Sequence, residues 1–451
     1  MRKANRPWKI AVAVFSLLLT ILIWAKGLED SFDRPSVAPS LSLKQQEIAY
    51  LAGPAVPDSF RALLIGDSPK SSLKKMLGDI PKERLTDRQI LILSGLETSE
   101  DIRKKLVQMV SDENNYQDLK NLLLKDSQEV LGSNDLLNTL LIPDDPVLSK
   151  VLCESFIGDS KNCLDMDVAR NVSIRLFISQ ILPLILILLG VVLLIKKLWL
   201  TYKKSIKPMP DLITIPLSLV DMVILIAGGF VVLGEVLFPA LLIPLSELFT
   251  GGFDSSLKIA SRVFIGYLAM TIPTLFILYK QINGLRAKEK PIGGWLQMKI
   301  QPFPSNLLQA FSSWLMVMPI VLLTTWVVNK FVGDQGGSNP LLEMVLNNQN
   351  TFALVLLLIT TVIFAPLFEE LIFRGTLLPS LSGSIGKNWS VLVSAIIFAL
   401  AHLSVGEFLP LFVLGLALGL LRLSSGSLFP CVVMHSLWNG VTFANLLLLA
   451  I

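Results

Sequence analysis

The chain has 451 residues, of which 52% are hydrophobic and 16% are charged, with a net charge of +4. This composition excludes an ordinary soluble protein and is typical of a protein with several membrane-spanning helices. Residues 27–172 hold 24 acidic against 17 basic side chains, whereas the remainder holds 11 acidic and 22 basic ones. The sequence therefore predicts an acidic soluble insert within a basic-flanked membrane body, and no basic stripe indicates a nucleic-acid partner.

The first segment, residues 1–27, is basic up to Lys9 and apolar from Ile10 to Ala25. This pattern is that of an N-terminal transmembrane anchor or of a secretory signal peptide, because Ala25-Lys26-Gly27 is a weak cleavage sequence. We favour the anchor. Either interpretation keeps the N-terminus in the cytoplasm and places the following segment outside.

Residues 28–172 contain no apolar run long enough to span a bilayer, and we predict an extracytoplasmic, mostly helical soluble domain. Apolar residues repeat at helical spacing in 86–96 and 101–124; in the second segment they are Ile102, Leu106, Met109 and Val110. We expect these stripes to form the domain core or a surface for a protein partner. They carry no catalytic signature.

Two of the three cysteines, Cys153 and Cys163, fall near the end of this domain. In an oxidising compartment they could form a disulfide, and two free thiols are the alternative. Their spacing indicates no metal site.

Eight further apolar runs each reach or approach the roughly 20 residues needed to cross a bilayer; they are 174–195, 212–245, 259–279, 306–332, 352–381, 389–405, 408–421 and 428–450. The predicted fold is an all-α polytopic membrane protein with about nine transmembrane helices. Residues 173–305 would hold helices two to four and a basic cytoplasmic loop, and residues 306–451 the remaining five. The third run could break at Pro239 or Pro244 into a span and an interfacial piece.

Lysines and arginines gather after the second run and around the loop that follows the fourth, whereas the intervening loops are almost free of positive charge. Nine crossings from a cytoplasmic N-terminus satisfy this distribution. The extracytoplasmic insert and the basic loops favour a bacterial plasma membrane or a thylakoid-like membrane.

Glu369-Glu370-Leu371-Ile372-Phe373-Arg374 lies inside the apolar run 352–381. Charges at bilayer depth cost several kcal/mol, so such a cluster is a functional-site hypothesis; the alternative is that the run ends at Leu367. On a helix Glu370 and Arg374 share one face as an i,i+4 pair. Glu369 points elsewhere, has no partner in its own helix, and is therefore the better candidate for proton chemistry.

The two histidines of the chain, His402 and His435, both fall within apolar runs, and Asn439 lies one helical turn after His435. A single histidine at such a position is often a hydrogen-bonded packing residue. Antiparallel neighbouring helices would, however, bring Glu369, His402 and Asn439 to similar depths of roughly 18–20 Å. This agreement predicts one polar cluster.

A carboxylate and an imidazole can together deprotonate a water, and a histidine with an amide donor can stabilise the oxyanion of a tetrahedral intermediate. Hydrolysis is therefore the chemistry that this set favours. The alternative is a zinc site formed by Glu369, His402 and His435, because two histidines and a glutamate are a known catalytic zinc ligand set.

Glu-Glu-x-x-Phe-Arg, Phe-x-x-x-His and His-x-x-x-Asn occur in this order on successive apolar runs. The combination resembles the CPBP family of intramembrane proteases, which includes the Ras-converting prenyl-protein endopeptidase, and the resemblance covers roughly residues 307–451. It implies a protease core in which Glu369 and His402 activate water and His435 and Asn439 stabilise the oxyanion. The implied supporting residues are Glu370, Arg374, Phe373 and Phe398.

The resemblance leaves open whether the mechanism is of the glutamate type or metal-dependent; we favour the former, without a cofactor, and zinc is the alternative. The leading hypothesis is an endopeptidase that cleaves a membrane-associated protein or peptide. A non-catalytic membrane scaffold or regulator and a proton-coupled transporter are the competing hypotheses. The transporter predicts polar groups at unequal depths across the membrane. Prenylated CAAX proteins are not expected substrates in a bacterial or thylakoid-like membrane.

Overall fold

The computed structural model describes residues 6–111, 116–124, 142, 145–158, 163–205, 209–333, 337 and 339–450. Within these residues the secondary structure is helical, and no strand occurs. The chain is an all-α polytopic membrane protein, as the composition predicts. It folds into two compact units, one formed by Met1–Val37 with Leu184–Leu446 and the other by Ala38–Pro183 with Leu447–Ile451.

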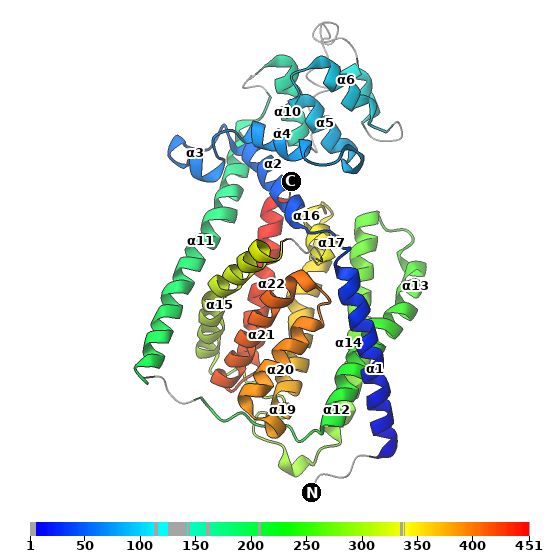
Figure 1. The fold of residues 1–451 in the computed structure, drawn as a ribbon, viewed down its shortest axis with the longest axis vertical. Coiled ribbons are helices and arrows are strands. Elements are labelled where there is room, and N and C mark those ends of the chain that lie inside the picture. The colour runs from blue at the N-terminus through cyan, green and yellow to red at the C-terminus, as the bar shows by residue number, and fades with distance from the viewer. Residues whose placement is uncertain are drawn as a thin grey trace. The chain divides into compact units, whose positions relative to one another are not determined.

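Eight helices among the described residues are long and apolar enough to cross a membrane. Six carry one label each in Figure 1: α1 (Pro7–Ser31), α11 (Met166–Tyr202), α14 (Ser255–Asn283), α15 (Phe303–Phe331), α21 (Val405–Ser425) and α22 (Phe429–Leu449). Two are composite: Leu219–Thr250 and Thr351–Ile385.

Each composite helix contains π-helical turns. The first consists of α12 (Leu219–Val223), the π-helix η2 (Ile224–Leu237) and α13 (Phe238–Thr250). The second consists of α17 (Thr351–Leu358), the π-helix η4 (Ile359–Phe364), α18 (Ala365–Ile372), the π-helix η5 (Phe373–Leu377) and α19 (Leu378–Ile385). The third apolar run thus remains one helix through Pro239 and Pro244; Pro239 lies in the first turn of α13, where its missing N–H costs least.

Eight of the nine predicted apolar runs form helices of spanning length among the described residues, and the ninth forms a shorter apolar helix. The apolar run 389–405 forms α20 (Lys387–Leu400), which has 14 residues and is roughly 21 Å long, shorter than a full span. The helix stops because Leu403 has a left-handed φ of 49° and Ser404 caps the start of α21. His402 therefore lies in a turn between two helices.

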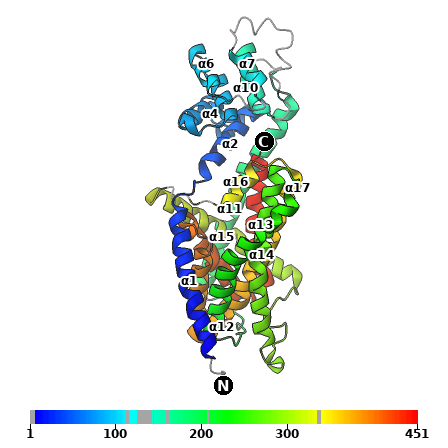
Figure 2. The same ribbon diagram turned by 90° about the vertical axis from the view of Figure 1, so that its right-hand side faces the viewer.

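Within the membrane unit the long helices run alongside one another (Figures 1 and 2). α1 packs on η2, and an ion pair of 2.8 Å joins Lys9 to Asp221 at the start of α12. α14 packs on η2 and α17, whereas α21 packs on both α15 and α20. Gly415 and Gly419 form the seam of α21 against α20, because a Cβ at Gly419 would lie 2.9 Å from the Val391 side chain.

The second unit contains a set of short helices: α2 (Ala38–Ala52), α3 (Asp58–Leu64), α4 (Pro69–Gly78), α5 (Asp87–Leu96), α6 (Glu100–Gln108), α7 (Gln117–Leu124), a 3₁₀ turn at Lys82–Arg84 and α10 (Pro146–Ile157). A capping box of Thr86 and Gln89 begins α5, at the start of the segment 86–96 that periodicity marks as helical.

The segment 101–124 forms two helices instead of one amphipathic stretch. Leu106 and Val110 are buried, but Ile102 and Met109 are each 45% exposed, so only part of the predicted stripe faces the core. In the same unit a disulfide joins Cys153 to Cys163.

Candidate active site

The acidic pair Glu369-Glu370 lies on α18, between the π-helical stretches η4 and η5. The helix continues for 35 residues from Thr351 to Ile385, so the alternative in which the apolar run ends at Leu367 is wrong. A π-helical turn contains an additional residue and changes which side chains and carbonyls face a neighbouring helix. The two glutamates are thus presented from inside a long helix and not from its end.

Glu370 is fully buried and is the centre of a polar network. Its Oε1 accepts hydrogen bonds from Arg374 Nη1 at 2.8 Å and from His435 Nδ1 at 2.9 Å. The contact with Arg374 is the i,i+4 pair expected from helical geometry. Because a carboxylate only accepts, the proton of this bond lies on His435 Nδ1, which leaves Nε2 to face away from Glu370.

Glu369 lies on the other side of His435. Its side chain is 16% exposed, and its Oε2 is 3.9 Å from His435 Nε2. The same oxygen is buried and accepts no hydrogen bond from the described residues. Tyr267 of α14 interacts electrostatically with this carboxyl, and its hydroxyl donates to the Ala365 carbonyl at 3.4 Å. Oε2 of Glu370 likewise has no donor among the described residues, so what distinguishes Glu369 is its partial exposure, which lets water reach it.

His402 follows the end of α20 and donates from Nδ1 to the Phe398 carbonyl at 2.8 Å. A carbonyl cannot donate, so this bond selects the tautomer in which Nε2 carries the free lone pair. His402 makes no ion pair with Glu369 in the described part of the chain. Its ring packs instead on Phe398, 4.8 Å between centroids.

Phe398 connects the two histidines. Its ring centroid is 5.8 Å from that of His435 and 5.4 Å from that of Phe373, and the Arg374 guanidinium lies 4.3 Å above its face. Such edge contacts and cation–π contacts are favourable for a buried aromatic ring. The two predicted supporting phenylalanines thus pack against the polar residues of the cluster.

Asn439 lies one turn beyond His435 on α22 and donates from Nδ2 to the Thr361 carbonyl at 2.8 Å. Thr361 is part of η4, where the π-helical turn leaves this carbonyl open to a partner outside the helix. An amide nitrogen carries two hydrogens, so one N–H of Asn439 remains for a further acceptor.

Three contacts of this site were not predictable from the sequence. The bond between His435 and Glu370 joins different helices and has no local signal. Tyr267 lies on a helix outside the motifs, where one tyrosine is unremarkable. Arg422 at the end of α21 is also buried, and its Nε donates to the Arg374 carbonyl at 3.2 Å; an arginine that ends an apolar run suggests only a cytoplasmic boundary.

Zinc is the metal that the sequence left as an alternative. Among the described residues, no three His, Cys, Asp or Glu side chains are grouped so that they could hold a metal ion. Glu369, His402 and His435 are therefore not gathered into a zinc site as they are arranged here, although the Nδ1 bonds of both histidines leave Nε2 as the nitrogen that could bind a ligand.

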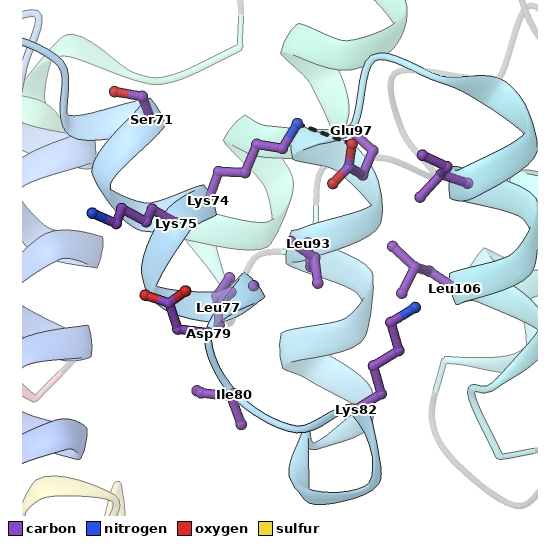
Figure 3. A pocket seen from close by; sticks show the side chains of 12 residues that line it. Ser71, Lys74, Lys75, Leu77, Asp79, Ile80, Lys82, Leu93, Glu97 and Leu106 are labelled. Carbon is purple, nitrogen blue, oxygen red and sulfur yellow. Dashed lines mark ion pairs between the residues drawn. The ribbon is translucent and has the colours of Figure 1, made fainter.

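A separate hollow of about 550 Å³ lies in the second unit (Figure 3). Leu77, Leu93 and Leu106 contribute apolar side chains to its wall, and an ion pair of 2.9 Å between Lys74 and Glu97 crosses its rim. Ile102 and Leu106 of the predicted apolar stripe line it, but none of the candidate catalytic residues does, and no group of the cluster above belongs to this unit.

Comparison with protein families gives two matches. Residues 38–174 match a domain of unknown function (DUF8675), and residues 351–441 match the type II CAAX prenyl endopeptidase Rce1-like family. No curated protein and no solved structure matches the chain. The second match includes the three motifs, the polar network of Glu370 and both histidines. This integral membrane protein therefore carries, at residues 351–441, a domain similar to the type II CAAX prenyl endopeptidase Rce1-like family, in agreement with the resemblance of its motifs to the CPBP family.

Proposed function

We propose that this protein is an intramembrane endopeptidase that hydrolyses a peptide bond of a membrane-associated protein or peptide. The observation that carries the proposal is the position of His435 between two carboxyls: Glu370 at 2.9 Å on Nδ1 and Glu369 at 3.9 Å on Nε2. The Glu370 carboxyl is bonded within the polar network, and the Glu369 carboxyl is the one proposed to take part in catalysis.

Glu369 and His402 are proposed to activate the attacking water. The Glu369 Oε2 atom has no hydrogen-bond donor among the described residues, and the His402 tautomer presents an unprotonated Nε2. A water between them could donate one hydrogen to each group, and either group could accept the proton as the water attacks the carbonyl. The partial exposure of Glu369 fits a group that must meet water.

His435 and Asn439 are proposed to stabilise the oxyanion. Asn439 keeps one amide N–H free after its bond to Thr361. His435 can donate from Nε2 when it is protonated, and the buried carboxylate of Glu370 on Nδ1 stabilises that cation. Donors held in place before the reaction are worth more than mobile ones because they need no reorganisation.

The contacts favour this function over a proton-coupled transporter. A relay across the membrane needs groups at successive depths, whereas Glu369, Glu370 and His435 contact one another directly.

We further propose a cytoplasmic N-terminus, an extracytoplasmic position for residues 28–172 that suits the Cys153–Cys163 disulfide, and a bacterial plasma membrane or thylakoid-like membrane.

The test is proteolysis by the purified full-length protein in liposomes, with a panel of fluorogenic peptides and membrane proteins, with and without a strong chelator. We expect Glu369→Gln and His402→Asn each to lower kcat by about 100-fold to 10,000-fold. The matched control is Glu235→Gln, because Glu235 is another glutamate in a membrane helix, and among the described residues its one hydrogen bond is accepted from Trp24 Nε1 at 3.3 Å.

The outcomes separate the alternatives. Loss in both site variants, retention in Glu235→Gln and no effect of chelator support a glutamate-type protease. Loss with chelator and recovery with zinc would replace this mechanism with a metal-dependent one. Wild-type activity retained by both site variants would contradict the proposed roles, and a wild type that cleaves nothing would favour the scaffold hypothesis.

A further inference from the structure

The turn that carries His402 is short and strained. It connects α20 to α21 through residues 401–404, and Leu403 has a φ of 49°, in the left-handed region that is costly for a branched residue. Such a conformation persists only where surrounding contacts hold it. Ser404 supplies one of these contacts by capping α21, with its Oγ accepting from Glu407 N at 3.2 Å.

The end of α1 supplies the next contacts. Ser31 is fully buried, and its Oγ accepts a hydrogen bond from Val405 N at 3.2 Å. Arg34 Nη2 donates to the carbonyl of Leu403, the strained residue itself. The Leu403 side chain packs on Gly27, where a Cβ would lie 2.8 Å from Leu403 Cδ1. Both peptide groups that flank Ser404 are therefore held by the first helix and the residues just after it.

The loop between α15 and α16 (Pro340–Leu346) braces these residues from another side. Gly337 N donates to the Arg34 carbonyl at 2.9 Å, and a Cβ at Gly337 would lie 3.0 Å from the Ser31 carbonyl oxygen. Asn339 N donates to Glu407 Oε1 at 3.2 Å. The Glu407 carboxylate in turn interacts electrostatically with both His402 and Arg34.

We infer that Ser31 and Arg34 are positioning residues for His402, which they hold by fixing the conformation of its turn. The inference rests on the proposed role of His402 as a base. Both residues lie outside the matched segment 351–441 and immediately before the domain that begins at residue 38. The junction between the first helix and the soluble domain is thereby a structural part of the catalytic centre.

The inference is tested with full-length Arg34→Ala, Arg34→Lys and Ser31→Ala proteins in liposomes. Misplacing a catalytic base by about 1 Å costs up to roughly 100-fold in rate, so we expect kcat to fall about 10-fold in Arg34→Ala with KM unchanged. Arg34→Lys keeps the charge and one donor and is expected to recover part of the rate. Arg61→Ala is the matched control, because within the described part of the chain the Arg61 guanidinium has its polar contacts with Gly53 and Asp58, both in the second unit.

A second readout does not depend on a substrate. The chain has two histidines, so modification by diethyl pyrocarbonate, followed by mass spectrometry, compares His402 directly with His435. We expect Arg34→Ala and Ser31→Ala to raise the modification rate of His402 several-fold and to leave that of His435 unchanged. General loosening of the fold would raise both rates.

Unchanged kcat and unchanged His402 labelling in both Arg34→Ala and Ser31→Ala would overturn the inference, and so would equal increases at the two histidines. These results are distinct from failure of the proposed function. In that case His402→Asn itself would keep wild-type activity, while the labelling change in Arg34→Ala would still report that this residue holds the turn.

Discussion

Two adjacent carboxyls in the same helix have different surroundings. Glu370 is completely enclosed and its Oε1 is bound to Arg374 and His435, whereas Glu369 is partly exposed and lies 3.9 Å from His435 Nε2. A buried charge is tolerated only when it is paired and hydrogen-bonded. Glu370 meets this requirement through its Oε1, which fits the supporting role proposed for it, and the more exposed Glu369 is the residue proposed to react.

At this residue scale we predict that Glu370→Gln destabilises the protein and also lowers its activity. The substitution removes the countercharge of a fully buried guanidinium, which is expected to cost roughly 3–5 kcal/mol, and releases the tautomer of His435. The measurements are the thermal unfolding midpoint in detergent and the cleavage rate. Glu343→Gln, an exposed glutamate on α16, is the control; equal midpoints in the two variants would contradict the network described here.

At the scale of elements, the close approach of helices depends on particular glycines. Gly190 on α11 faces the backbone of α15, and a Cβ there would lie 2.1 Å from the Leu315 carbonyl oxygen. In an isolated helix alanine is preferred to glycine by about 1 kcal/mol, so propensity and packing oppose each other at this position. Packing decides because two backbones cannot move apart without losing the contacts around them.

We therefore predict that Gly190→Ala lowers the free energy of unfolding by about 1–3 kcal/mol, as overpacking does elsewhere. Gly252→Ala is the matched control, since nothing lies within 4 Å of a Cβ at that position. Chemical denaturation in mixed micelles measures both variants. A Gly190→Ala protein as stable as the control would mean that α11 does not lie against α15 as described.

The π-helical turns η4 and η5 are a second feature at the scale of elements. They flank the two glutamates, and η4 provides the carbonyl that Asn439 contacts. From hydropathy, this region is only one apolar run. An additional residue in a helical turn changes the direction in which the following side chains point, but it does not change the composition, so hydropathy cannot detect it. The alignment of Asn439 with the acidic helix is thus a property of the folded element.

At the scale of the whole molecule, the orientation in the membrane has a direct test. Cys153 and Cys163 are bridged and Cys431 is buried, so the background of reactive thiols is low. We predict that a membrane-impermeant maleimide labels Ser71→Cys in intact cells and labels Lys288→Cys only after permeabilisation, because positive loops stay in the cytoplasm. Both positions are exposed. The reverse pattern would invert the proposed topology.

Some features followed from the sequence because their causes are local. The lengths of the apolar runs determined where the chain can cross a membrane, and the i,i+4 spacing determined the Glu370–Arg374 pair. The fold class and the family resemblance were predictable for the same reason, since the apolar runs indicate the first and the order and spacing of the three motifs indicate the second. The motif roles of Glu369, His402, His435 and Asn439 remain predictions.

Other features were decided only by the tertiary structure. His435 and Glu370 are 65 residues apart, and Arg34 meets Leu403 across 369 residues, so no periodicity could pair them. Apolar composition also could not predict that α20 ends at Leu400, because contacts from the first helix fix the conformation of the turn around His402. Local spacing thus supplied the chemical groups, and long-range packing decided which of them meet.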